Sequence, residues 1–170
     1  MKDKTITKYL HQLYQVIAEP LKNIEIYFSA DGSGVSNSYG RSRWMTIRHT
    51  KKEEKQRRFY SKLHIMIGTK TGIIASARVT DGHANESPLF RPLLDDTAKI
   101  FTIKEVSADA GYIGRENVNA VAEKGGAPYI MAKRGIHVPM KGPMTPWGSM
   151  LRLWKHHQMF FLEHYHRRSK

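Results

Sequence analysis

The sequence predicts an α/β domain with a mixed sheet flanked by helices. Two observations support this prediction: segments with the period-two alternation of strands, and segments with apolar residues at helical spacing. They follow one another as strand, hairpin, helix, strand, helix, strand, loop and helix. A mixed sheet with helices on its faces fits this order. The length of 170 residues suits one domain.

The chain is expected to begin with a helix followed by a strand. Residues 1–22 carry apolar side chains at helical spacing, and Pro20 falls near the end of this segment. The strand is predicted over residues 24–31, and Asp-Gly-Ser-Gly at 31–34 is expected to end it. One face of this strand is apolar and carries Ile24, Ile26, Phe28 and Ala30. These residues alternate with Glu25, Tyr27, Ser29 and Asp31 on the other face.

The middle of the chain predicts a hairpin and a helix. Lys70-Thr71-Gly72 forms the turn of the hairpin. The apolar sides of its strands are Leu63, Ile65 and Ile67, then Ile73, Ala75, Ala77 and Val79. Ser87-Pro88 predicts a helix start, because a capping residue precedes a proline at the first helical position. Pro92 is expected to distort this helix.

The second half alternates strands and helices. Strands are predicted at 103–109 and 127–132, with a helix at 115–124 between them and a loop at 133–146. From Trp147 the chain is predicted to be helical to its end. The apolar stripe of this helix is Trp147, Leu151, Trp154, Phe161 and Tyr165.

The charge of the chain points to a polyanionic partner. Lys and Arg number 28 against 15 Asp and Glu, a net charge of +13. Nucleic acid is the default partner for such a surface, with ribosomal-type or nonspecific binding as the alternatives. The chain has no cysteine, so carboxylate, His or carbonyl groups would have to hold any metal. No apolar run approaches the roughly 20 residues that cross a bilayer, and a cytoplasmic protein is expected.

Residues 41–62 form a strongly basic block. Trp44 and Tyr60 lie within it, and a short strand is conceivable at 44–48. We favour DNA contact for this block over a solvated charged loop, because it combines cations with aromatic residues. Its basic residues are Arg41, Arg43, Arg48, Lys51, Lys52, Lys55, Arg57, Arg58 and Lys62.

Two aspartates stand out by position. Asp31 and Asp109 each end a predicted strand, and glycine follows each within two residues. Either one alone would usually be a turn or capping residue. If their strands are neighbours, the two carboxylates lie close together, which is unfavourable unless a cation bridges them. With a third acid, such a pair can hold two divalent ions about 4 Å apart, the arrangement used for in-line phosphoryl transfer.

Five segments in order resemble the catalytic domain of insertion-sequence DDE transposases. The resemblance runs from about residue 24 to the last residue. The segments are Phe28-Ser29-Ala30-Asp31-Gly32-Ser33-Gly34 at the first acid, Trp44 with Tyr60-Ser61-Lys62-Leu63-His64, Val79-Thr80-Asp81-Gly82-His83-Ala84-Asn85-Glu86-Ser87, Ala108-Asp109-Ala110-Gly111-Tyr112 at the second acid, and Tyr165 with Arg168 in the third motif.

The chain departs from the family pattern at both ends. By the motif spacing, the third acid would fall at position 172, whereas the sequence runs to Lys170. Glu163 is not assigned this role, because it leaves the apolar stripe and is expected to face solvent. A DNA-binding region usually precedes the first acid. Residues 1–23 are therefore interpreted as an N-terminal helical remnant and residues 24–170 as a C-terminally truncated catalytic domain, from a fragment, a decayed copy or a split reading frame.

The resemblance implies a ribonuclease-H-like fold and metal-dependent DNA cleavage and strand transfer. It makes Asp31 and Asp109 catalytic ligands of Mg²⁺ or Mn²⁺, with transposon ends and target DNA as partners. A homodimer and a nucleoid-associated cytoplasmic location are compatible with it. The expected DNA-binding residues are Arg41, Arg43, Trp44, Arg48, Lys51, Lys52, Arg57, Arg58, Lys62, His64, Tyr165 and Arg168.

Without a third acid, this chain alone is expected to be nearly inactive, and measurable strand transfer with Mg²⁺ would contradict that expectation. Two rival functions remain. One is a non-catalytic basic DNA-binding remnant, in which substitution of Asp31 would change no measurable property. The other is a metal-dependent nuclease of the same fold, which would lack specificity for transposon ends.

Overall fold

A five-stranded mixed sheet forms the centre of the molecule. The computed structural model describes residues 4–36, 60–138 and 143–169. The strand order is β3-β2-β1-β4-β5. The strands are β1 (Tyr27–Ser36), β2 (Tyr60–Gly68), β3 (Ile74–Asp81), β4 (Glu105–Ala108) and β5 (Ala127–Ile130). β1 is antiparallel to β2 and parallel to β4. At the two edges of the sheet, β3 is antiparallel to β2, and β5 is parallel to β4. The predicted mixed sheet and hairpin are confirmed, and Gly72 takes a positive φ of 74° in the hairpin turn.

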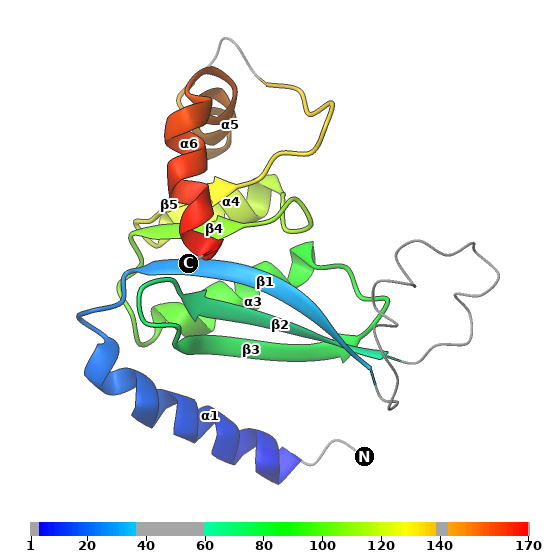
Figure 1. Ribbon diagram of the computed structural model, residues 1–170, viewed down its shortest axis with the longest axis vertical. Helices are drawn as coiled ribbons and strands as arrows, with labels where there is room; N and C mark the ends of the chain where they lie inside the picture. Colours follow the sequence, from blue (N-terminus) through cyan, green and yellow to red (C-terminus); the bar gives the residue numbers. More distant parts are fainter. Residues whose placement is uncertain (1–3, 37–59, 139–142, 170) are drawn as a thin grey trace, which may run out of the picture.

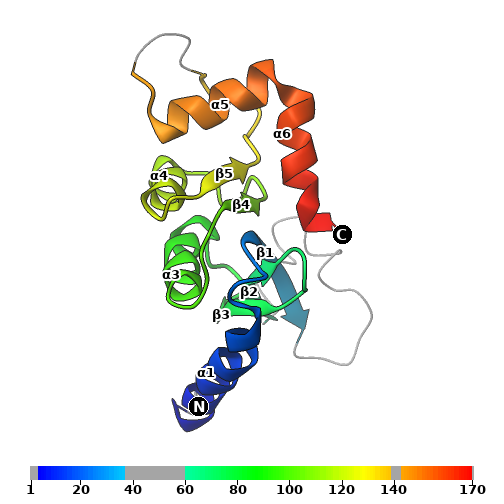
Figure 2. The same cartoon turned by 90° about the vertical axis from the view of Figure 1, so that its left-hand side faces the viewer.

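Helices cover both faces of this sheet (Figure 1). α3 (Ser87–Ala98) and α4 (Arg115–Glu123) pack on one face, where Phe90, Leu94 and Val118 are fully buried. α6 (Gln158–Tyr165) and the short helix η3 (His166–Ser169) lie on the other side, as the edge-on view in Figure 2 shows. α1 (Lys4–Ala18) and η1 (Glu19–Leu21) precede the sheet. No helix in the described ranges is long and apolar enough to cross a membrane.

The single C-terminal helix predicted from Trp147 is wrong. α5 (Pro146–His156) ends at His157, whose φ and ψ of −128° and 51° are not helical, and α6 then starts in a different direction (Figure 2). The apolar stripe nevertheless packs against the core on both sides of the break, because Leu151 and Phe161 are fully buried. The break directs α6 and η3 toward β1 and β4.

The predicted end of the first strand is wrong, whereas the helix predicted from Ser87 forms. β1 does not end at Asp31 but continues to Ser36, because β2 pairs with it as far as Tyr60 opposite Ser36. α3 runs through Pro92, whose side chain lies on the exposed side of the helix. A proline there removes one backbone hydrogen bond without ending the helix.

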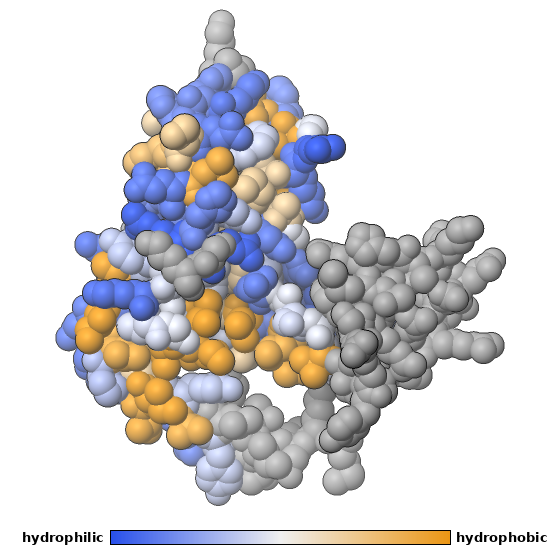
Figure 3. Space-filling model, viewed as in Figure 1, coloured by the Kyte–Doolittle hydropathy of each residue, from blue (hydrophilic) through white to orange (hydrophobic). Residues whose placement is uncertain are grey.

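The buried face of β2 is the polar one. Lys62, His64 and Met66 are buried against α3, whereas Leu63, Ile65 and Ile67 are half-buried on the opposite face. Figure 3 shows apolar side chains gathered over this part of the sheet, beneath the C-terminal helix. The hairpin prediction thus found the correct strands, and the apolar side of β2 proves to face away from α3.

Candidate active site

The two predicted aspartates follow paired residues of neighbouring parallel strands. Ala30 of β1 pairs with Ala108 of β4, and this is the last pair in their register. Asp31 and Asp109 come next on the two strands. Because the strands are parallel, both aspartates lie at the same end of the paired stretch of β1 and β4. This arrangement brings together the two acids that the sequence singled out.

A glycine amide holds each carboxylate. Gly32 N donates to Asp31 Oδ1 at 2.9 Å, and Gly111 N donates to Asp109 Oδ1 at 2.8 Å. Hydrogen bonds from backbone amides stabilise the charged form of a carboxylate and restrict its orientation. The two acids are therefore held in matching ways, each by a glycine that follows within two residues.

Arg168 brings a positive charge to the first acid. Its Nη2 lies 3.2 Å from Asp31 Oδ1, and its Nη1 donates to the Tyr165 hydroxyl at 3.0 Å. η3 thus places Arg168 of the predicted third motif beside Asp31, and Tyr165 at the end of α6 accepts a hydrogen bond from this arginine. The Arg168 side chain is 14% exposed and that of Asp31 is 56% exposed, so solvent reaches this pair from the Asp31 side.

Tyr112 lies among several charged groups of the site. The side chain is fully buried, and burial raises the pKa of its phenol. The nearby carboxylates of Glu86, Asp109 and Asp31 raise this pKa further, in that order of effect. The phenol therefore stays protonated, and its oxygen lies 3.2 Å from His64 Nδ1.

A buried ion pair lies beside this tyrosine. Lys62 Nζ is 2.6 Å from Glu86 Oε1, and the two side chains are only 11% and 19% exposed. His64 is fully buried, and its Nε2 is 3.0 Å from Thr80 Oγ1. The polar face of β2 thus carries a connected network of charged and neutral groups. The burial of Lys62 and His64 favours an internal role over the DNA contact predicted for them.

His64 should make stability depend on pH. Burial, and then the charge of Lys62, lower the pKa of His64 from its ordinary value of 6.5, and Glu86 offsets part of this change. The folded protein therefore binds this proton less readily than the unfolded chain. The free energy of unfolding should fall as the pH drops below 6.5 toward the lowered pKa, and should be retained above 6.5.

Urea unfolding at several pH values between 7.5 and 5 measures this dependence. His64→Gln removes the titrating group and should flatten the profile relative to the wild type, even if it lowers stability overall. A profile equally steep in the variant and the wild type would contradict the prediction. Glu163→Gln, a change on the exposed face of α6, is the control that should leave the profile unchanged.

The other predicted DNA-binding residues divide into two groups. Tyr165 and Arg168 lie at the site, as described above. The remaining ones lie outside the described residues, together with the strand considered at 44–48: Arg41, Arg43, Trp44, Arg48, Lys51, Lys52, Arg57 and Arg58.

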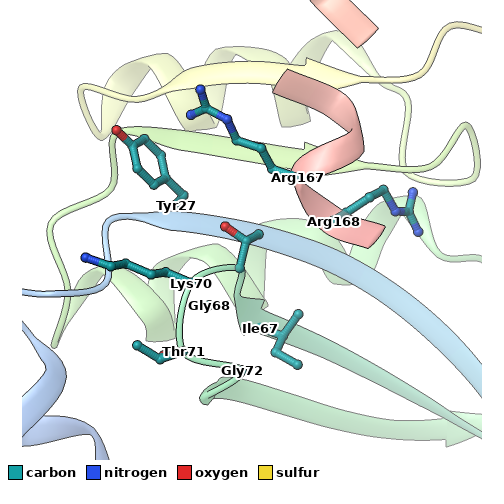
Figure 4. Close-up of a pocket in the computed structure, with 9 residues that line it drawn as sticks. Tyr27, Ile67, Gly68, Lys70, Thr71, Gly72, Arg167 and Arg168 are labelled. Atoms are coloured by element: carbon teal, nitrogen blue, oxygen red, sulfur yellow. The ribbon is translucent and has the colours of Figure 1, made fainter. Parts of the chain in front are cut away.

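A cavity of about 720 Å³ opens next to η3 (Figure 4). It lies between the β2–β3 turn and Arg167, and Tyr27 and Lys70 line it. Arg167 extends over the Tyr27 ring, 4.9 Å from its centroid, and bonds to Glu105 at 2.8 Å. Arg168 points the other way, toward Asp31. Lys70 was predicted only as part of the hairpin turn, and Arg167 lies between the two residues of the third motif, so the sequence indicated no binding role for either.

The donor set at the two aspartates fits a hard divalent cation in part. Carboxylate oxygens are the ligands that Mg²⁺ and Mn²⁺ prefer. Among the described residues, no group of three or more His, Asp or Glu side chains is arranged to hold a metal ion. Within the described ranges, the carboxylates of Asp31 and Asp109 are thus the two candidate ligands that this site offers such an ion.

The family to which the chain belongs follows from comparison with known proteins. A model of the transposase DDE domain matches residues 28–168, which span every strand of the sheet and both aspartates. No curated protein matches the chain. The mixed sheet flanked by helices agrees with the ribonuclease-H-like fold of this family, whose members act on DNA and use divalent metal ions. The chain belongs to the DDE transposase domain family.

Proposed function

We propose that the chain is the catalytic domain of an insertion-sequence transposase that cleaves DNA and transfers its strands. Asp31 and Asp109 hold a divalent cation, Mg²⁺ or Mn²⁺, which supplies charge stabilisation to phosphoryl transfer when bound. The observation that supports the proposal is the register of β1 and β4, in which Asp31 and Asp109 directly follow the paired residues Ala30 and Ala108. Two adjacent carboxylates without a cation repel each other.

The surroundings of the aspartates support a phosphodiester substrate. Arg168 pairs with Asp31 and can turn its remaining donors to a phosphate oxygen. Lys70 and Arg167 add positive charge to the cavity on the other side of η3. The basic block at 41–58 would add contacts to the DNA backbone that carry no sequence preference. In this proposal transposon ends and target DNA are the partners, and the nucleoid is the site of action.

Metal binding tests the proposal directly. Asp31→Asn and Asp109→Asn each remove one charged ligand and keep the size of the side chain. Loss of a group that hydrogen-bonds to a metal ligand lowers metal affinity by roughly 10–100-fold. Each aspartate variant loses a ligand itself, so its Mn²⁺ affinity should fall by more than this. Isothermal titration of the 170-residue chain with Mn²⁺ gives the dissociation constants.

The matched control is Glu163→Gln, which removes an exposed carboxylate on α6 and should leave the Mn²⁺ dissociation constant unchanged. Equal Mn²⁺ affinity in the wild type and both aspartate variants would sink the catalytic proposal. That result would favour the rival interpretation as a basic DNA-binding protein without catalysis.

A further inference from the structure

Glu86 inserts its carboxylate between the two segments that carry the aspartates. It occupies the N-cap position of α3, and its side chain is 19% exposed. A Cβ on Gly111 would overlap Glu86 Oε2 and would lie 2.9 Å from Glu86 Cδ. A Cβ on Gly32 would lie 3.4 Å from Glu86 Oε1. One carboxylate thus lies against both glycines, Gly32 within β1 and Gly111 in the turn after β4.

These two glycines are the ones whose amides hold the acids. Gly32 donates to Asp31 Oδ1 and Gly111 to Asp109 Oδ1. Asp109 Oδ1 also lies 3.0 Å from the Gly111 Cβ position that Glu86 overlaps. A movement of the Glu86 carboxylate would therefore free space beside both amides and let each aspartate change its orientation.

Lys62 fixes the Glu86 carboxylate in this position. The Nζ–Oε1 distance is 2.6 Å, and both side chains are largely buried. Lys62 comes from β2, and β2 pairs with β1 along its whole length. The ion pair therefore connects β2 to the start of α3, directly behind Gly32 and Gly111. Tyr112 and His64 complete the enclosure of Gly32, at 3.2 Å and 3.5 Å from its Cβ position.

We infer that Glu86 is a positioning residue of the metal site, which sets the spacing and orientation of Asp31 and Asp109 through Gly32 and Gly111. The inference rests on the proposed function, since it concerns the same two acids. Glu86 acts through the glycines and is not itself a ligand, because Lys62 engages its carboxylate. Groups behind metal ligands commonly change metal affinity by about 10–100-fold when removed.

Mn²⁺ titration of Glu86 variants tests this inference. Glu86→Ala removes the carboxylate and should weaken Mn²⁺ binding by about 10-fold. Glu86→Gln keeps the shape between the glycines and should restore most of the affinity. In ¹⁵N NMR spectra, the Gly32 and Gly111 amide signals should shift in Glu86→Ala and stay close to their wild-type positions in Glu86→Gln.

Glu25→Gln is the control that distinguishes positioning of the metal ligands by Glu86 from a general effect on stability. Glu25 precedes the start of β1, away from the aspartates, so this change should lower stability without changing Mn²⁺ affinity.

If Glu86→Ala binds Mn²⁺ as tightly as the wild type while Asp31→Asn and Asp109→Asn do not, the inference fails and the proposed function stands. If the aspartate variants also bind like the wild type, or the wild type binds no Mn²⁺, the proposed function fails and takes the inference with it. Equal Mn²⁺ losses in Glu86→Ala and Glu25→Gln would also overturn the inference, because they would follow from lost stability alone.

Discussion

Glu25→Ala should destabilise the domain by about 3 kcal/mol, because it removes a fully buried carboxylate that organises the β2–β3 turn. Glu25 Oε2 accepts hydrogen bonds from Lys70 N at 3.1 Å, from Thr71 N at 2.8 Å and from the Thr71 hydroxyl at 2.8 Å. Alanine would leave these donors without their acceptor and would empty the buried space that the carboxylate fills. A buried donor without a partner costs roughly 1–3 kcal/mol.

Thermal and urea unfolding measure this loss, which corresponds to a decrease in Tm of roughly 10 °C for a domain of this size. Glu25→Gln keeps the shape and one carbonyl acceptor, so its loss should be about half as large. Glu163→Ala, on the exposed surface of α6, is the matched control and should change stability by no more than about 0.5 kcal/mol. A Glu25→Ala variant as stable as this control would show that the turn does not depend on the carboxylate.

Glu25 also shows where the sequence was insufficient. Alternation placed Ile24 on the apolar side of the first strand and Glu25 on the other. In the structure Ile24 is 46% exposed and Glu25 is fully buried. The strand begins only at Tyr27, so the pattern did not apply to residues 24–26. The donors that this carboxylate accepts from lie 45 and 46 positions further along the chain, a separation that no local pattern can reveal.

The acids were predictable because their signals are local. A strand that ends in Asp followed by glycine can be recognised from a few residues, and β1 and β4 prove to be neighbours. The polar face of β2 was not predictable in this way. Leu63, Ile65 and Ile67 have the apolar character of a core, yet α3 packs on the side of Lys62 and His64. Which side of a strand is buried depends on where the helices lie, and that choice is made by tertiary structure.

Glu86 lies in a segment that resembles the transposase family, but the residues next to it in the sequence did not indicate that its carboxylate would approach the aspartates. The signal lay elsewhere, in the glycine two positions after Asp109. A glycine can be required by a positive φ or by the close approach of another group. At Gly111 the close approach of Glu86 provides the reason, and only the structure identifies the residue that approaches.

Gly111→Ala should therefore destabilise the domain by about 2–3 kcal/mol, since the new methyl group overlaps Glu86 Oε2 and must displace it. Displacement would pull Glu86 away from Lys62, and disrupting a buried ion pair leaves each charge poorly compensated. The Asp109 side chain limits any shift of the new methyl group, because its Oδ1 lies 3.0 Å from the same position. Urea unfolding at pH 7 measures the change in the free energy of unfolding.

A double-mutant cycle with Glu86→Ala identifies the cause of the loss. If the overlap is responsible, Gly111→Ala should cost little in a chain that already lacks the Glu86 carboxylate, and the coupling energy should be about 2 kcal/mol. If the loss instead came from the backbone conformation at position 111, it would be the same in both backgrounds and the coupling would be near zero. A large coupling would establish that Glu86 and the Gly111 segment beside Asp109 compete for one space. This contact is the physical basis on which Glu86 can control the orientation of an acid it does not bond.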